Sequence, residues 1–284
     1  FPILFAGSDM QKRDLFDCLN RGGMACFALT EPGAGSDAGA VSCRAEKVEG
    51  GYILNGTKCF ITNAPIADKI TLFANTREGG GIRGLTVFLV DADTKGISIG
   101  KEEDKMGIRA SATAEIIFED CFVLDSARVG KEGRGFMIAM QTLQMSRPVV
   151  AAISVGIAQA AIEAAVAYSH HRKQFGVKIA TFEMVQQMIA DMVMKTEAAR
   201  ILTYKACVAQ MNKDKKAGLY SAMSKCFASD TAMEVTTTAV QVMGGNGYSR
   251  ENPVEKYMRD AKIMQIYEGT NQVQRLVIAN ETTF

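Results

Sequence analysis

The sequence has few histidines, no paired cysteine motif and little net charge. Its only two histidines, His170 and His171, are adjacent, which excludes a histidine-rich metal site. A Ser-His-Asp triad would have to use one of these two residues. No two of the seven cysteines have CxxC spacing, and their number is odd. This pattern favours buried thiols in a reducing compartment over a disulfide framework or a zinc site, so no metal is expected.

Charge and hydrophobicity exclude two further classes of partner. The net charge is +1, from 32 basic and 31 acidic residues, so there is no basic surplus with which to bind nucleic acid. No apolar run approaches membrane-spanning length, so no membrane partner is expected. The 284 residues, 48% of them hydrophobic, are enough for one large globular domain or two modest ones. The chain opens with Phe1 rather than an initiator Met and has no basic leader, so it reads like the interior of a protein.

The first part of the chain, from Cys26 to about Arg128, has the pattern of short strands. Glu49-Gly50-Gly51 predicts a turn, and Asn55-Gly56 is a strong hairpin signal. Gly79-Gly80-Gly81 predicts a mobile loop. We therefore expect a small antiparallel barrel or sandwich of about six to eight strands. The β-prone runs are residues 41–48, 52–54, 59–61, 70–74, 85–90 and 114–118.

The second part, from about Gly135, has apolar residues at helical spacing, and glycine and proline become rare. Four or five long amphipathic helices with short links predict a bundle, which makes the fold class α+β. Pro148 should kink a helix or mark its start. Residues 244–247 should stop another helix. The expected helices cover residues 155–168, 182–209, 217–243, 253–266 and 271–279.

Three segments could bind a ligand, and each also has a plain structural interpretation. In Thr30–Asp37, glycines allow close backbone approach and hydroxyls can bind phosphate oxygens, but a simple turn is the commoner meaning. It is not a Rossmann motif, because no helical pattern follows. Arg172 more often complements a helix dipole than clamps a phosphate. The three glycines of residues 241–247 exceed what a helix cap needs, so close approach to a ligand is plausible.

Glu268 stands where the helical pattern breaks, just before Gly269. A carboxylate at such a junction is usually solvated, or lies near the N-terminus of the next helix, where the dipole favours negative charge. In a dry site the same carboxylate becomes a tunable general base. The residues alone leave both interpretations open.

Six segments together resemble the acyl-CoA dehydrogenase family, in order and in spacing, from about residue 10 to residue 280. The likeness is greatest to butyryl- and medium-chain members. Each segment is moderately specific, and coincidence among all six is negligible. They are TEPGAGSDAG, FITNA, KMGIRASATAEIIFEDC, RKQFG, QVMGGNGYSRENPVEKYMRDAKI and IYEGTNQVQR.

The resemblance implies three parts. Residues 1–24 would be a remnant of an N-terminal helical domain, with its final helix around residues 9–20. In relatives that domain roofs the acyl tail pocket. Residues 25–131 would form the middle β-domain, and residues 132–284 the C-terminal helical bundle. The family binds FAD between these last two domains and assembles as a dimer of dimers, so FAD and a homo-oligomer are expected.

The resemblance also assigns cofactor contacts. Residues lining the flavin side of the first loop would be Phe27, Leu29, Thr30, Gly35 and Ser36. Phe60 and Thr62 would pack near the isoalloxazine ring, although many relatives carry Trp at the position of Phe60. Thr270 and Gln272 would touch the cofactor after the catalytic glutamate. The adenine and diphosphate end of a flavin held mainly by a neighbouring subunit would contact Arg172, Phe175, Gln241, Gly244 and Gly245.

The expected chemistry is dehydrogenation of an acyl-CoA to the trans-2-enoyl-CoA. Glu268 would take the α-proton while the β-hydrogen leaves as hydride to the flavin. The Glu268 N–H and a ribityl hydroxyl would polarise the carbonyl. Electrons would pass to an electron-transfer flavoprotein. Contacts to the substrate would come from Ser36, Arg147, Tyr267 and Gly269.

One stretch discriminates within the family. Certain branched- and long-chain members carry their base on the segment equivalent to Gln144–Arg147, which has no carboxylate here and leaves Glu268 alone for the role. Gln144 also departs from the Asp of many relatives. The expected substrate is a straight acyl-CoA of short to medium length, in the cytoplasm or the mitochondrial matrix. The alternatives are an oxidase, an enoyl-CoA reductase running in reverse, and a truncated non-catalytic interaction subunit.

Overall fold

The computed structural model describes residues 1–283, which form two compact units. The sheet unit comprises Phe1–Lys105 and Arg109–Thr142, and the helical unit comprises Met106–Ile108 and residues 143–283. Helices α1 (Pro2–Ala6) and α2 (Asp9–Asn20) belong to the sheet unit, where Gln11 of α2 donates hydrogen bonds to the carbonyls of Ser126 and Arg128. The three-part division 1–24, 25–131 and 132–284 stays a prediction.

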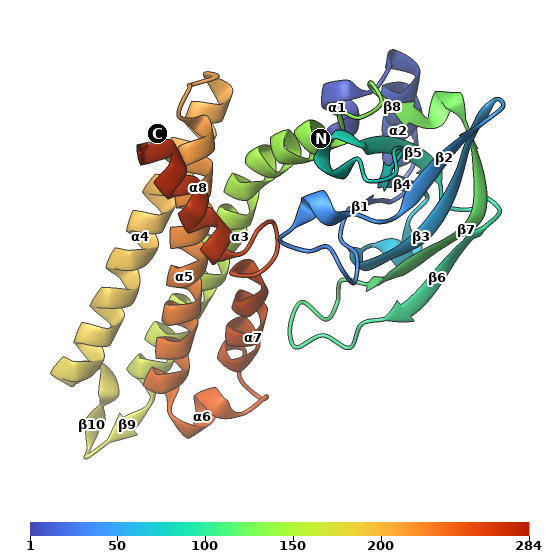
Figure 1. The fold of residues 1–284 in the computed structure, drawn as a ribbon. Coiled ribbons are helices and arrows are strands. Elements are labelled where there is room, and N and C mark those ends of the chain that lie inside the picture. Colours follow the sequence, from blue (N-terminus) through green and yellow to red (C-terminus); the bar gives the residue numbers. More distant parts are fainter. Residues whose placement is uncertain (284) are drawn as a thin grey trace. The chain divides into compact units, whose positions relative to one another are not determined.

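Eight strands form one sheet, in the order β6-β7-β3-β2-β4-β5-β8, with β1 beside β4 (Figure 1). A β-domain followed by a helical bundle is therefore confirmed. The expectation of a wholly antiparallel sheet is wrong, because β4 pairs in parallel with β1 and, at one residue pair, with β2. About 40 residues separate β1 from β4, and such a crossover permits parallel pairing. The strands are β1 Ala25–Ala28, β2 Arg44–Val48, β3 Gly51–Thr62, β4 Lys69–Asn75, β5 Leu85–Asp91, β6 Ile97–Glu102, β7 Thr113–Leu124 and β8 Arg128–Val129.

The predicted hairpin turn at Asn55-Gly56 is wrong. Strand β3 runs straight through both residues, and its register against β7 shifts between Leu54 and Gly56. Gly56 has a φ of 144°, and a Cβ there would lie 2.8 Å from the Cα of Cys43. The glycine therefore permits an irregularity in the strand and a close backbone approach rather than a turn. The turn predicted at residues 49–51 is confirmed, since β2 ends at Val48 and β3 begins at Gly51.

The helical unit is built around α5, which buries residues along most of its length. In Figure 1, α4, α7 and α8 lie alongside α5, and α6 lies at its C-terminal end. A short hairpin of β9 and β10 follows α3. The residues of α3 before Leu143 belong to the sheet unit. The elements are α3 Gly135–His171, β9 Lys173–Gln174, β10 Val177–Lys178, α4 Glu183–Met211, α5 Ala217–Met243, α6 Gly245–Tyr248, α7 Val254–Met264 and α8 Asn271–Thr283.

Pro148 lies inside α3 and does not mark its start. A proline in a helix interior has no N–H to donate, which leaves the carbonyl four residues earlier without its usual partner. That carbonyl belongs to Gln144, and it accepts a hydrogen bond of 3.1 Å from the side chain of Gln210 on α4. The tertiary contact satisfies the freed carbonyl, which helps the helix to continue through the proline.

Among the described residues, α3 is the one helix long and apolar enough, by length and composition alone, to cross a membrane. A core helix meets the same test. In the helical unit, Ala158, Ala161, Ile162 and Ala165 of α3 are buried in the main hydrophobic cluster. Packing therefore accounts for part of the apolar composition of α3, and the absence of a membrane partner stays a prediction.

Candidate active site

Glu268 lies in a strained turn between α7 and α8. Its φ is 57° and that of Gly269 is 86°, both in the left-handed region. For a residue other than glycine, this conformation costs about 1–2 kcal/mol and persists only where neighbours impose it. Gln274 of α8 donates to the carbonyls of Glu268 (3.3 Å) and Gly269 (2.8 Å), and Lys225 of α5 donates to the Gly269 carbonyl at 2.8 Å. The conformation of the turn is thus fixed from two helices.

Helix α3 contributes the closest partner of the carboxylate. The Ser146 hydroxyl donates to Glu268 Oε2 at 2.5 Å. The next residue, Arg147, is buried, and its Nε has no hydrogen-bond partner in the described chain. A buried guanidinium with a free donor is suited to bind a ligand oxygen. Sequence reasoning identified Arg147 but missed Ser146, although both lie in the stretch Gln144–Arg147, where some relatives carry their base.

The electrostatics of the turn favour a base that titrates above its ordinary range. Burial raises the pKa of Glu268, and the Ser146 hydrogen bond and the positive charges of Arg147 and Lys225 oppose that rise. Burial lowers the pKa of Lys225 to about 8, and the nearby Arg147 charge acts in the same direction. A half-buried carboxylate with a raised pKa has the properties of a general base.

The backbone of the turn also offers a donor. Among the described residues, no group accepts a hydrogen bond from the Glu268 N–H. A free N–H adjoining a carboxylate can donate to an oxygen on which negative charge develops. The turn therefore combines a proton acceptor and an oxyanion donor in one residue.

In the sheet unit, the predicted flavin loop lies against β3. The Cys59 N–H donates to the Thr30 carbonyl at 3.0 Å, which brings the loop beside Phe60. Phe60 is 65% exposed despite its size and has a φ of 56°. Gly35, Ser36 and Thr62 are exposed as well. Leu29 is buried, and the ring of Phe27 packs at a tilt against the core residue Phe73 with 4.9 Å between ring centroids, so the side chains of these two residues belong to the core.

An ion pair that sequence reasoning missed holds this loop in place. Lys58 of β3 is fully buried and donates to Glu31 Oε1 at 2.7 Å and to the Leu29 carbonyl at 2.9 Å. The Glu31 carboxylate also accepts from the backbone N–H groups of Ser42 (2.7 Å) and Cys43 (3.0 Å). Both charges are satisfied, so the pair fixes residues 29–31 relative to β3.

The other predicted cofactor residues of the helical unit lie far from Glu268. The Asn246 side chain donates to the Tyr168 hydroxyl at 2.6 Å, which joins α6, directly after α5, to the last turn of α3. From Lys225 to Gly244, α5 rises about 28 Å at roughly 1.5 Å per residue. The unit therefore has two separate groups of predicted cofactor residues. Thr270 and Gln272 adjoin the Glu268 turn, and the far group is Arg172, Phe175, Gln241, Gly244 and Gly245.

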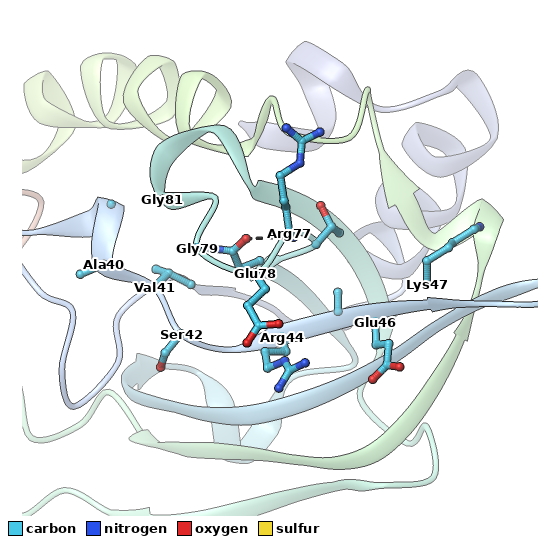
Figure 2. Close-up of a pocket in the computed structure, with 14 residues that line it drawn as sticks. Ala40, Val41, Ser42, Arg44, Glu46, Lys47, Arg77, Glu78, Gly79 and Gly81 are labelled. Carbon is cyan, nitrogen blue, oxygen red and sulfur yellow. Dashed lines mark hydrogen bonds between the residues drawn. The ribbon is translucent and has the colours of Figure 1, made fainter.

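A hollow on the sheet unit lies beside β2 and the loop that follows β4, and no predicted site residue lines it. Arg44, Lys47 and Arg77 border it together with Glu46 and Glu78. Figure 2 shows the charged ends of the three basic side chains pointing in different directions. They do not converge on one point, so the hollow is not built as an anion site.

The two parts of the chain match two family models. Residues 26–121 match the acyl-CoA dehydrogenase middle domain, and residues 133–282 match the acyl-CoA dehydrogenase C-terminal domain. The chain belongs to the acyl-CoA dehydrogenase family. Its members are flavoprotein oxidoreductases of fatty-acid β-oxidation and are typically tetramers. The family and enzyme class predicted from the six segments are confirmed.

Individual relatives agree. The short-chain specific acyl-CoA dehydrogenase, mitochondrial, of Rattus norvegicus is 46% identical over 279 residues, which is 98% of this chain and 68% of that protein. The structure of butyryl-CoA dehydrogenase from Megasphaera elsdenii superposes with a TM-score of 0.97 at 46% identity, covering 100% of this chain and 74% of that one. A structure described as the electron transferring flavoprotein of Acidaminococcus fermentans gives a TM-score of 0.96 at 49% identity, covering 99% and 74%.

Proposed function

We propose that this acyl-CoA dehydrogenase catalyses FAD-dependent α,β-dehydrogenation of a straight acyl-CoA of short to medium length, with Glu268 as the base. The observation that carries the proposal is the Glu268 carboxylate, held at 2.5 Å from Ser146 in a turn fixed from two helices, with a raised pKa. The names of the butyryl-CoA and short-chain relatives support the chain length.

The side chains present fit the flavin cofactor. Phe60 and Phe175, which is 94% exposed, are aromatic surfaces left uncovered within the chain. A Cβ added at Gly35, Gly244 or Gly245 would meet no atom within 4 Å, so the backbone is open to close approach. FAD, when bound, accepts the β-hydrogen as hydride. The residues proposed to hold it are Phe27, Leu29, Thr30, Gly35, Ser36, Phe60, Thr62, Arg172, Phe175, Gln241, Gly244, Gly245, Thr270 and Gln272.

The residues of the turn account for the proton. The α-proton moves to the Glu268 carboxylate while the Glu268 N–H donates to the thioester carbonyl oxygen as negative charge develops there. Burial raises the pKa of Tyr267 to about 12, so this substrate-contact residue stays an uncharged phenol. Further substrate contacts are assigned to Ser36, Arg147 and Gly269.

The distance between the two groups of cofactor residues supports an oligomer. We assign the far group, which includes Arg172 and Gly244, to a flavin held by a neighbouring chain in a dimer of dimers. Helix α4 supports this with one exposed apolar face, made of Met194, Ile201, Tyr204, Val208 and Met211. Sedimentation of the flavin-loaded protein should show at least two chains per particle, and a flavin-loaded monomer at micromolar concentration contradicts the assignment.

The electron acceptor is proposed to be an electron-transfer flavoprotein, as the description of one similar structure suggests. A reducing compartment, the cytoplasm or the mitochondrial matrix, is supported by the seven unpaired cysteines, six of them buried. The intact Glu268 turn and flavin loop argue against a non-catalytic interaction subunit. An oxidase and a reverse enoyl-CoA reductase would keep both features, and they are not favoured because the relatives at 46–47% identity are named dehydrogenases. Absence of flavin, reaction with oxygen, and reduction of the enoyl-CoA by a physiological donor would identify these three in turn.

The test is the visible spectrum of the FAD-loaded protein before and after anaerobic addition of butyryl-CoA. We expect the flavin to bleach, and Glu268→Gln to bleach about 10²–10⁴-fold more slowly, the usual contribution of a positioned base. Flavin content should be unchanged in the variant. If Glu268 is only a charge near a helix N-terminus, its loss costs roughly 0.3–1 kcal/mol of stability and bleaching stays fast, which would overturn the proposal.

A further inference from the structure

Lys225 is a fully buried lysine with no carboxylate partner. Its ammonium donates to the Gly269 carbonyl at 2.8 Å and to Asn271 Oδ1 at 2.9 Å. In the part of the chain that the structure describes, no carboxylate lies within ion-pair distance of it. Burying an ammonium among neutral acceptors is unfavourable. Its position directly against the Glu268–Gly269 turn therefore calls for a functional explanation.

The two ends of the turn are tied to α5 by a carboxylate one helical turn further on. Asp230 Oδ1 accepts from the Gln265 side chain at 2.6 Å, just after α7, and from the Asn271 side chain at 2.7 Å, at the start of α8. The Asn271 N–H also donates to the Gln265 carbonyl at 3.0 Å. The first and last residues of the segment between α7 and α8 are therefore hydrogen-bonded to each other and to α5. Lys225 contacts the middle of the same segment, at Gly269.

The contact between Lys225 and the Gly269 carbonyl lies in the strained part of this segment. Only Lys225 and Gln274 donate to the Gly269 carbonyl among the described residues. Glu268 and Gly269 both have positive φ, and such a backbone relaxes when the contacts that impose it are removed. A rotation of this peptide would move the Glu268 carboxylate away from the Ser146 hydroxyl.

We propose that Lys225 is a positioning residue for Glu268, whose ammonium holds the Gly269 carbonyl and Asn271 so that the carboxylate faces the α-carbon of the substrate. The inference rests on the proposed function of Glu268 as the base. Lys225 acts through the backbone of the turn and through its charge, without touching the substrate itself.

The positive charge of Lys225 makes a second, independent measurement possible, the pH dependence of flavin reduction. The groups that face Glu268 are Ser146 and Arg147 from α3 and Lys225 from α5, and Tyr267 adjoins it in the turn. Lys225 in turn faces Cys226 and Asp230 of its own helix. Positive charge on Lys225 lowers the pKa of Glu268. Its removal should therefore move the acid limb of the rate profile to higher pH, an effect that a loss of packing alone does not produce.

The experiment uses Lys225→Met, which keeps the length of the side chain and removes its donors and charge. We expect the limiting rate of flavin reduction by butyryl-CoA to fall about 10²-fold, as for a misplaced catalytic group. The apparent dissociation constant of butyryl-CoA and the flavin content should stay near wild type, and the acid limb should move upward. A wild-type limiting rate, or an acid limb in its wild-type place, would overturn the proposal.

A matched control is Val235→Ala, on the same helix and buried in the hydrophobic core. It should lower the unfolding temperature and leave the rate and the acid limb unchanged. Equal slowing in both variants would show a merely structural role. Should Lys225→Met not fold, Lys225→Gln keeps a donor and removes the charge, and its acid limb must still move upward.

Glu268→Gln, measured beside these variants, separates the two proposals. If it retains fast flavin reduction, the assignment of the base is wrong. If it is slow while Lys225→Met reduces flavin at the wild-type rate, only the role of Lys225 is wrong.

Discussion

Two lysines, one in each unit, have fully buried side chains that hold a segment proposed to bind a ligand, but their surroundings differ. Lys58 in β3 forms an ion pair with Glu31, and together they fix the flavin loop. Lys225 in α5 contacts only a carbonyl and an amide. Burial lowers the pKa of both lysines, and acidic groups oppose that fall at both, but only Lys58 has one of them, Glu31, in direct contact.

The difference indicates which of the two charges has a role in the chemistry. A buried pair with all its hydrogen bonds made is self-contained and says little about function. A buried cation without a counter-ion is expected where another group needs its charge. That group is Glu268, whose pKa the ammonium lowers against the effect of burial. Variants of the two lysines should therefore fail in different ways.

Lys58→Met should have the largest effect on stability. Removing one partner of a buried ion pair typically costs about 3–5 kcal/mol, because the remaining charge is left uncompensated. Here the remaining charge is Glu31, and the loop that it anchors should loosen. We expect the denaturation midpoint and the flavin content to fall together. In Lys225→Met, by contrast, the flavin content should stay near the wild-type value.

The double variant Lys58→Met/Glu31→Gln sharpens this expectation. Residues in direct contact usually show coupling energies of about 0.5–3 kcal/mol, so the double variant should be less destabilised than the sum of the two single variants. Strict additivity would show that the two charges do not interact.

The lowered pKa of Glu31 predicts how the same ion pair responds to acid. The ionised Glu31 carboxylate stabilises the fold above its ordinary pKa of 4.5, and this stabilisation is lost as pH falls through the lower pKa of the folded state.

Much of the fold could be predicted from local sequence signals. The periodicity of apolar residues predicted the helices, and β-prone runs predicted most strands. The wrong predictions concern positions where contacts with residues distant in the sequence determine the local structure. Gly56 permits a close approach to Cys43, which no turn signal reveals. Pro148 stays inside α3, where Gln210 of another helix satisfies the carbonyl that the proline leaves without a partner.

The candidate site could be predicted only in part, and for the same reason. Glu268 was identifiable from its motif, but its partners come from α3 and α5, distant in sequence. Lys225 did carry a signal, since a lysine among the buried residues Ala222, Ser229 and Ala232 is unusual on an apolar helix face. The pairing of Lys58 with Glu31 carried none, because alternation along a strand does not show which charges meet.

Ser146→Ala should have the smallest effect and provides a direct comparison with Lys225→Met. The substitution removes the hydroxyl that donates to Glu268 Oε2. That hydrogen bond lowers the pKa of Glu268, so its loss should raise this pKa and move the acid limb of flavin reduction to higher pH. The turn itself is held by Gln274 and Lys225, so the limiting rate at high pH should stay near wild type. The free energy of unfolding should change by about 0.5–1.5 kcal/mol, the usual net effect of one hydrogen bond.

The two variants therefore share the direction of the shift in pH and differ in the plateau. Lys225→Met should lower the plateau because the carboxylate is misplaced, whereas Ser146→Ala should leave the carboxylate in place as a slightly stronger base. Stopped-flow measurement of flavin reduction across pH tests both. A lowered plateau without a shift in Ser146→Ala would mean that the hydroxyl orients the carboxylate and does not tune its pKa. Both α3 and α5 would then position the base, and the distinction between a tuning contact and a positioning contact would no longer hold.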